Sequence, residues 1–492
     1  MKITSYDILS DIRQSGLMKM QPGKPRLGVG MGTCGIGNGA REVFAALQQE
    51  LARRELDYSL VPVGCFGFCA VEPLVNFHLP GHPLLILKEV NPEDAAEIIS
   101  ALEEQRRPQC GILCRIEEWD HITSQIRYGL SSWDRSRHPS PYADVPLWNE
   151  VPFFHGQKKI ILRNCGLINP EDIDEYIAVG GYQALNNAMT MPSRREVIEE
   201  VVKSKLRGRG GAGFPTGKKW RMLKQQEAET KYLICNADEG DPGAYMNRNE
   251  IESDPQMLIE GMVIAAYATG ASEGIVYLRA EYPLAVERLQ NAIDQAREYG
   301  LLGHHIFGNE FSFDIQLVEG AGAFVCGEET ALIASLEGKA GRPRPRPPFP
   351  AQKGLWGMPT NINNVETWCN VPAILSRGAT WFTETGTVNS SGTKVFSLVG
   401  KIRNTGLVEM PLGSKLKDII YEIGGGSPSG KRIKAIQTGG PSGGCIPAEH
   451  FEATVDYEAL RELGAIMGSG GMVVMDEDTC MVDVARYFIE FS

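Results

Sequence analysis

Residues 207–220, RGRGGAGFPTGKKW, combine five glycines with four basic side chains in a chain whose formal net charge is −12. Gly208, Gly210 and Gly213 fit G-x-G-x-x-G, which binds dinucleotide phosphates when a strand precedes it and a helix follows. Here the preceding SRREVIEEVVKSKL has helical apolar spacing, which excludes the ordinary Rossmann interpretation. Closely spaced glycines still let backbone N–H groups converge on phosphate oxygens, so the segment predicts an anion-binding loop. A flexible basic loop is the alternative.

Two later segments each predict a short strand that ends in polar residues. KYLICNADEGDPGAYMNR gives a strand followed by carboxylates and an amide, where side chains at the end of a strand can meet a ligand. IQLVEGAGAFVCGEETALIASLEGK gives a strand, a small-residue turn, the pair Glu328 and Glu329, and a helix. Carboxylates at a helix start also gain from the helix dipole, so a purely structural role for this pair is the alternative.

Two more segments complete the set. RPRPRPPFP is an extended basic stretch in which prolines hold Arg342, Arg344 and Arg346 outward. MPTNINNVETW places Asn363 and Asn364 before another helix. Apart from the basic stretch, these segments are four polar, glycine-rich loops, and together they predict a large ligand.

Composition excludes several classes of protein. The acidic balance disfavours nucleic acid as a partner, and no apolar run is long enough to span a membrane. The N-terminus lacks the apolar region of a signal peptide, and eleven cysteines in unequal clusters disfavour a secreted disulfide framework. The pair His304–His305 has no partner for acid–base catalysis, so we predict no catalytic residue.

The first hundred residues alternate strand and helix patterns, with PRLGVGM, DYSLVPV, LVNFHL and PLLILKEV as strands. Cys34, Cys65 and Cys69 follow the first two strands, where thiolates can gather. This order resembles the thioredoxin-like 2Fe-2S ferredoxin domain, whose pattern is C-x4-C followed by C-x3-C. Val29 stands where the first cysteine would fall, so three metal ligands are present where four are usual. Redox-inert cysteines in a degenerate domain are the alternative.

The stretch from 105 to 150 is irregular in pattern, and residues 131–146 read as a linker or an extended arm. Cys110 and Cys114 repeat the C-x-x-x-C spacing, but without a second pair we expect free thiols.

From about residue 150 to the end, the order and spacing of these motifs resemble the NADH-binding FMN flavoprotein of the complex I 51-kDa type. ADEGDPGA is most similar to the soluble hydrogenase and formate dehydrogenase subunits of that family. The resemblance implies bound FMN with NAD(H) stacked over it, and hydride transfer carried by the flavin. It implies these cofactor-binding residues: Gly208, Arg209, Gly210, Gly211, Ala212, Gly213, Phe214, Gly217, Lys219, Asn236, Asp238, Glu239, Asp241, Phe324, Gly327, Glu328, Glu329, Arg346, Phe349, Asn363 and Asn364.

Within that set, the resemblance gives Phe214 and Phe349 the adenine sandwich, and Glu329 and Arg346 the polar contacts to the dinucleotide. Two residues depart from the respiratory members of the family. Met222 stands at a position that is often aromatic, and Asp241 replaces a glutamate.

The last hundred residues resemble an SLBB module of ubiquitin-like fold, and then the start of the family's helical 4Fe-4S domain. Cys480 is the only cysteine in the last forty residues, so the cluster motif is absent and a 4Fe-4S cluster is expected only in a longer chain. The predicted α/β multidomain organisation is an N-terminal helix (1–24), a thioredoxin-like domain (25–108), a linker (109–150), a non-classical α/β FMN/NADH domain (151–392), the SLBB domain (393–452) and the start of the helical domain (453–492).

The sequence therefore predicts a cytoplasmic NAD(H)-linked flavoprotein subunit that exchanges electrons with iron–sulfur partners. The resemblance implies a hydrogenase or formate dehydrogenase catalytic subunit and a small 2Fe-2S ferredoxin-like subunit as partners, and it includes electron-bifurcating enzymes. The alternative is a non-catalytic scaffold that retains a relic nucleotide site.

Overall fold

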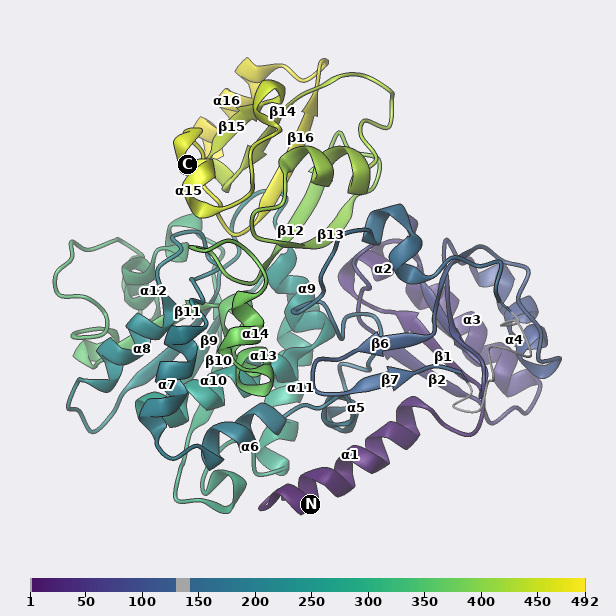
Figure 1. The fold of residues 1–492 in the computed structure, drawn as a ribbon, viewed down its shortest axis with the longest axis horizontal. Helices are drawn as coiled ribbons and strands as arrows, with labels where there is room; N and C mark the ends of the chain where they lie inside the picture. The colour runs from purple at the N-terminus through teal and green to yellow at the C-terminus, as the bar shows by residue number, and fades with distance from the viewer. Residues whose placement is uncertain (1, 130–141, 492) are drawn as a thin grey trace.

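The computed structural model describes residues 2–129 and 142–491, so the predicted linker at 131–146 lies largely outside the described residues. Three larger sheets and one two-stranded ribbon organise the described part of the chain, with the N-terminal, central and C-terminal thirds forming successive bodies (Figure 1). Helix α1 (Tyr6–Met20) begins at Ser5, whose hydroxyl accepts from the Ile8 N–H, and it lies against α5 (Ile173–Ala178) of the central body. The N-terminal segment is thus anchored to the central domain.

The N-terminal sheet has the strand order β2-β1-β3-β4-β5, in which only the β1–β2 pair is parallel. Its two faces enter different cores, because Leu85 packs with the helices of this domain while Ile86 packs with the central domain. Because successive side chains of a strand point to opposite faces of the sheet, β4 packs with both domains and joins them. The elements are β1 (Arg26–Gly30), α2 (Thr33–Gly37), α3 (Ala40–Arg53), β2 (Ser59–Val63), β3 (Val75–His78), β4 (Leu84–Leu87), α4 (Ala95–Glu103) and β5 (Ile112–Ile116).

Strand β5 corrects the predicted domain boundary at residue 108. Ile112–Ile116 pairs with β4 and adds the edge strand, with Cys114 fully buried, so the sheet continues into the stretch predicted to be a linker. A further ribbon of β6 (Glu118–Asp120) and β7 (Gln125–Arg127) follows. Strand β5 has only five residues and closely follows proline, glutamine and glycine, so its apolar pattern was too short to predict a strand from the sequence.

The central sheet is parallel throughout, in the order β10-β9-β8-β11. On one face of this sheet, the almost entirely buried α10 contacts α13, α7 and α8. On the opposite face, α12 packs with side chains of the strands. The elements are α6 (Gln183–Thr190), α7 (Arg194–Lys203), α8 (Thr216–Lys224), β8 (Tyr232–Ala237), α9 (Met246–Ser253), α10 (Pro255–Thr269), β9 (Glu273–Arg279), α11 (Pro283–Glu298), β10 (Asp314–Gly320), the 3₁₀ turn η6 (Phe324–Gly327), α12 (Glu329–Leu336), β11 (Thr360–Asn364), α13 (Val365–Arg377) and α14 (Ala379–Thr383). Because the strands are parallel, their carboxyl ends meet at one edge, where ligands bind in open α/β sheets.

The C-terminal sheet has the order β13-β12-β16-β14-β15. Its elements are β12 (Thr393–Gly400), β13 (Gly406–Pro411), a π-helical turn (Asp418–Ile423), β14 (Ile433–Thr438), β15 (Gly444–Pro447), α15 (Tyr457–Glu462) and β16 (Gly471–Asp476), followed by α16 (Met481–Phe491).

Strand β16 corrects the predicted start of a helical domain at residue 453. Gly471–Asp476 inserts between β12 and β14 as the central strand of this sheet, so the C-terminal domain continues at least to residue 476. The strand is separated from its partners by tens of residues, and a sequence pattern does not report that pairing. Helix α16 follows this strand, and none of its described residues is buried.

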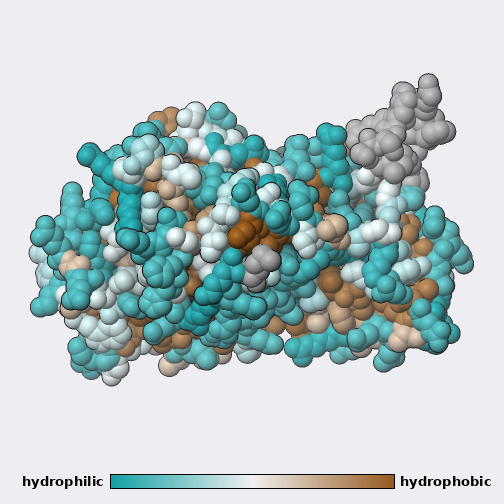
Figure 2. All heavy atoms as spheres, turned by 90° about the horizontal axis from the view of Figure 1, so that it is seen from below, coloured by the Kyte–Doolittle hydropathy of each residue, from teal (hydrophilic) through white to brown (hydrophobic). Residues whose placement is uncertain are grey.

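The face of the molecule below the view of Figure 1 is mostly hydrophilic, with hydrophobic residues in separate patches (Figure 2). Among the described residues, no helix combines the length and apolarity needed to cross a membrane.

Candidate functional site

The glycine-rich loop joins α7 to α8 and closes on itself. The Gly208 N–H donates to Phe214 O at 2.9 Å, and the Thr216 N–H donates to Leu206 O at 2.9 Å. Gly213 has φ +61°, and a Cβ there would lie 2.7 Å from the Tyr457 ring. The loop is therefore fixed between the central domain and α15, rather than flexible.

Two of the loop's four basic side chains hold the fold together. Arg209 is fully buried and donates to Ser391 O at 2.7 Å and Thr393 O at 3.0 Å, so its side chain binds the start of the C-terminal domain. Arg207 pairs with Glu458 at 2.7 Å. Lys219 alone among the loop's four basic residues lines a cavity. Arg207 and Arg209 therefore hold the loop in place, while Lys219 faces the site.

Two cavities open beside this loop, one of about 460 Å³ and one of about 740 Å³. We call them the first and second cavity. They share Gly210, Asn236, Gly327, Glu328 and Asn364, which come from the glycine loop and from the carboxyl ends of the parallel strands or the turns beyond them. The four polar loops that the sequence singled out therefore meet around one continuous, two-part site.

Eighteen of the twenty-one predicted site residues line these cavities, and three do not. The exceptions are Arg209, Gly211 and Gly217. A Cβ on Gly217 would lie 2.5 Å from Val202, and one on Gly211 would lie 3.2 Å from Gly468. These two glycines allow close packing of α8 on α7 and of the loop on the C-terminal domain. The residues lining the first cavity include Gly208, Ala212, Gly213, Phe214, Lys219, Glu329, Arg346, Phe349 and Asn363.

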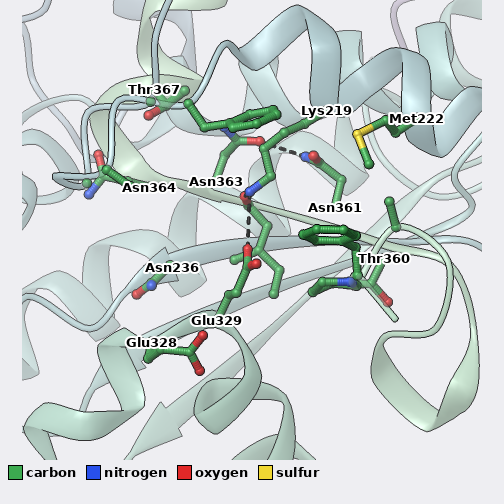
Figure 3. A pocket seen from close by; sticks show the side chains of 18 of the residues that line it. Lys219, Met222, Asn236, Glu328, Glu329, Thr360, Asn361, Asn363, Asn364 and Thr367 are labelled. Atoms are coloured by element: carbon green, nitrogen blue, oxygen red, sulfur yellow. Dashed lines mark hydrogen bonds and ion pairs between the residues drawn. The ribbon is translucent and has the colours of Figure 1, made fainter. Parts of the chain in front are cut away.

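Charged groups in the first cavity form a chain. Lys219 Nζ donates to Ile362 O at 2.7 Å and lies 3.3 Å from Glu329 Oε2 (Figure 3). Arg346 Nη1 lies 2.7 Å from Glu329 Oε1. Phe214 and Phe349 at the same cavity are 48% and 44% exposed, which leaves their rings open to an incoming ligand. Two cations, one carboxylate and two open rings suit an aromatic ligand that carries phosphates.

Glu328 has a structural role within the site. Its Oε2 accepts from the Thr330 and Ala331 N–H groups at 2.8 and 3.0 Å, which makes it the N-cap of α12. The structural alternative for the Glu328–Glu329 pair therefore describes Glu328, whereas Glu329 faces the cations.

The second cavity contains an unusual carboxylate. Asp238 is 8% exposed, and neither of its side-chain oxygens has a hydrogen-bond partner within the described residues. Burial raises its pKa to about 6, against the opposing effect of Arg279. By contrast, Glu239 accepts from the Asn247 and Arg248 N–H groups at the start of α9, and Asp241 accepts from Ser469 Oγ at 2.8 Å. Asp238 is thus the acid free to meet a ligand.

Several lining residues were not predicted from the sequence. Asn247 accepts from Asn364 Nδ2 at 2.5 Å, and its position inside α9 gave no signal. The C-terminal domain contributes Gly439, Ser442, Ile466 and Ser469 to the second cavity. Only their approach in three dimensions identifies them. Met222 and Phe324, which the sequence did single out, line the first and second cavity respectively.

The three predicted metal ligands also come together. Cys65 Sγ lies 4.0 Å from Cys69 Sγ, and Cys34 interacts with both thiols. Across the domain boundary, Tyr245 Oη lies 3.5 Å from Cys69 Sγ and Arg248 Nη2 lies 3.8 Å from Cys34 Sγ. In the part of the chain that the structure describes, no group of three or more His, Cys, Asp or Glu side chains is arranged to hold a metal ion. All described cysteines, including Cys110 and Cys114, are free thiols.

A parallel sheet with polar loops gathered around a two-part cavity defines the class of α/β proteins that bind nucleotide-type cofactors. Comparison with known proteins identifies the family within this class. Residues 201–373 match the Nuo51 FMN-binding domain, and residues 395–446 match the SLBB domain. The chain is 58% identical over 336 residues to the NADP-reducing hydrogenase subunit HndC of Solidesulfovibrio fructosivorans, covering 68% of each protein. It is 46% identical over 332 residues to an NADH-quinone oxidoreductase subunit of Rhizobium meliloti, covering 68% of this chain and 79% of that protein.

The fold has a counterpart among solved structures. An NAD+-reducing [NiFe]-hydrogenase in the air-oxidized state superposes with a TM-score of 0.59 and 26% identity, covering 99% of this chain and 77% of that one. The chain therefore belongs to the family of flavoprotein subunits that carry the Nuo51 FMN-binding domain. The predicted α/β multidomain fold and the family resemblance are confirmed.

Proposed function

We propose that this chain is the NAD(H)-linked FMN subunit of a multisubunit hydrogenase or formate dehydrogenase. It is an NADH dehydrogenase-type oxidoreductase subunit, with FMN and NAD(H) as its cofactors. The observation that carries the proposal is the two-part cavity in which the glycine loop and the three later segments meet. One part suits a flavin and the other suits a dinucleotide that lies against it.

Polar groups in both cavities fit FMN. Within the described residues, the two buried carboxylate oxygens of Asp238 in the second cavity and the buried side-chain oxygen of Asn361 in the first cavity have no hydrogen-bond partner, so they are available to a hydroxyl- or amide-bearing ligand. Gly210 lines both cavities, and a Cβ there would lie 3.1 Å from the Asn364 side chain. The absence of a side chain at Gly210 leaves the space that the flavin needs.

The remaining groups of the first cavity would hold the dinucleotide. Phe214 and Phe349 would enclose the adenine ring, and the Lys219–Glu329–Arg346 chain would contact the ribose and phosphates. When bound, FMN accepts a hydride and releases electrons singly, so it links a two-electron donor to one-electron carriers. The chain's own residues position the rings and exclude water, which requires no nucleophile or acid–base group.

The partners follow from this chemistry. Single electrons require iron–sulfur centres, which we place on a hydrogenase or formate dehydrogenase catalytic subunit and a small 2Fe-2S ferredoxin-like subunit, all in the cytoplasm. The relative that reduces NADP and the structure of an NAD+-reducing hydrogenase support a hydrogenase complex. Electron bifurcation stays a prediction. The test is anaerobic purification of the chain: a flavin absorption band that NADH bleaches supports the proposal, and a colourless protein that does not take up FMN overturns it in favour of a scaffold.

Charge reversal at Glu329 tests the dinucleotide site. In Glu329→Lys, a third cation stands between Lys219 and Arg346, so the chain of charges that would meet the dinucleotide is broken. We expect the KM for NADH to rise about 10-fold or more, equivalent to about 1.4 kcal/mol, with FMN content unchanged. Steady-state dye reduction measures the KM. Glu298→Lys, at the exposed end of α11, is the control; an unchanged KM in Glu329→Lys would remove Glu329 from the site.

The raised pKa of Asp238 gives FMN binding a defined dependence on pH. Ligand hydroxyls stabilise the ionised carboxylate, so bound FMN lowers this pKa from its value of about 6 in the free protein. The affinity for FMN should therefore rise with pH until about 6 and level off above it. Fluorescence titration of the apoprotein with FMN measures this, and Asp238→Asn should remove the step. A step that persists in Asp238→Asn would assign it to another group.

A further inference from the structure

The three thiols at Cys34, Cys65 and Cys69 fall one ligand short of the four that a [2Fe-2S] cluster needs. Val29, at the position of the absent cysteine, is fully buried in the hydrophobic core with α3 and α4. Its side chain therefore does not reach the thiols, and the fourth ligand must come from elsewhere.

Glu72 stands beside the gap. Its side chain lies next to the Cys65 thiol, and the residue is 7% exposed. Oε2 accepts from the Leu74 N–H at 2.7 Å, which fixes the carboxylate, while Oε1 is buried without a hydrogen-bond partner. Among the described residues, this buried carboxylate oxygen has no hydrogen-bond partner and its side chain lies beside the Cys65 thiol, so it is in place to act as a ligand.

Two glycines make room for this carboxylate. A Cβ on Gly30 would lie 3.2 Å from Glu72 Oε2, and a Cβ on Gly35 would lie 3.4 Å from the same atom. Gly30 follows Val29 and Gly35 follows Cys34, so the carboxylate lies against the segment between the position of the missing cysteine and Cys34. It comes from a residue more than forty positions later in the sequence than Val29.

The spacing of Cys65 and Cys69 is compatible with two thiolates on one iron of a cluster. Two thiolates about 2.3 Å from a tetrahedral metal are about 3.8 Å apart, close to the 4.0 Å between Cys65 Sγ and Cys69 Sγ. In a [2Fe-2S] cluster the bridging sulfides complete each iron, so only two protein ligands per iron are required. Three side chains around a single ion, which the described residues do not offer, are therefore not needed.

The site also adjoins the flavin-binding cavity through the start of α9. Tyr245 and Arg248 contact Cys69 and Cys34, while Asn247 between them lines the second cavity. Arg248 would offset the negative charge of a cluster, and the Tyr245 hydroxyl would donate to a ligating sulfur.

We propose that Cys34, Cys65, Cys69 and Glu72 together hold a [2Fe-2S] cluster, with the Glu72 carboxylate as the fourth ligand. The proposal deepens the proposed function, since it gives the flavin a one-electron acceptor within the same chain, but it stands on the geometry of the N-terminal domain.

The experiment uses the full chain, purified anaerobically, with iron and sulfide analysis and EPR of the reduced protein. The wild type should contain about two irons and two sulfides. Glu72→Gln removes the anionic oxygen with little change in shape, and it should lose most of the iron or shift the EPR g-values. Glu72→Cys should retain the cluster, with absorption and EPR shifted toward those of an all-thiolate site. Glu93→Gln, in the exposed turn before α4, is the matched control and should leave both signals unchanged.

Each outcome has a separate meaning. A wild-type chain that binds FMN and is reduced by NADH, yet contains no iron, overturns the cluster and leaves the proposed function intact. A cluster whose iron content and EPR are the same in the wild type, Glu72→Gln and Glu72→Cys overturns Glu72 as a ligand. FMN content shows whether each variant folds. If Glu72→Gln loses FMN as well as iron, the iron content and EPR of Glu72→Cys decide whether residue 72 is a ligand.

Discussion

Replacing Gly210 with valine should give a folded protein that no longer retains FMN. Gly210 lines both cavities, and even a Cβ at this position would lie 3.1 Å from the Asn364 side chain. Asn364 cannot move away easily, because its side chain caps α13 and donates to Asn247. The two methyl groups of valine must therefore occupy the space at the junction of the cavities. We expect the dissociation constant for FMN to rise at least about 100-fold, near 2.7 kcal/mol.

Flavin content after purification and titration of the apoprotein with FMN measure this effect. Gly23→Val is the control, since a Cβ on Gly23 meets nothing within 4 Å and the residue lies far from the site. Circular dichroism shows whether each variant folds. Normal FMN affinity in a folded Gly210→Val protein would contradict the position that we assign to the flavin.

Replacing Glu366 with alanine should destabilise the protein strongly. Glu366 in α13 and Lys394 in β12 form an ion pair in which both side chains are fully buried, and Glu366 Oε1 also accepts from the Val395 N–H at 3.0 Å. The alanine variant leaves the Lys394 ammonium buried without its counter-ion, which costs about 3–5 kcal/mol. Because this pair joins the central domain to the C-terminal domain beside Thr367 of the first cavity, FMN retention should fall as well.

Chemical denaturation followed by fluorescence, together with flavin release, measures the loss. The double variant Glu366→Leu/Lys394→Leu removes both charges, so it should be more stable than the single Glu366→Ala variant. Arg209 Nε also lies 4.0 Å from Glu366 Oε1, but its guanidinium keeps three backbone carbonyl acceptors in both variants. A single variant as stable as the wild type would show that the ion pair contributes little.

The sequence was most informative where chemistry and local pattern coincide. The loop 207–220, the strand ending at Asn236, the Glu328–Glu329 turn and the Asn363–Asn364 pair were all predicted to lie at element ends, and the structure brings them together. Local apolar periodicity also located the helix that precedes the loop, which was enough to exclude a Rossmann motif.

The direction of individual side chains could not be read in this way. Arg209 lies among the loop's glycines, yet it binds backbone carbonyls at the start of the C-terminal domain. Glu328 looked like a ligand-binding residue and is an N-cap. A motif specifies residue types at a spacing, whereas the packing of distant segments decides which way each side chain points.

By itself, then, the sequence determined the class of site and the elements that carry it, because glycine spacing, polar strand ends and helical periodicity are local properties. The tertiary structure alone decided which groups share a cavity. It placed β16 between β12 and β14, Ser469 against Asp241, and Glu72 beside Cys65. These pairings join residues that are far apart in the chain, and long-range contacts depend on how whole surfaces pack, which no short pattern encodes.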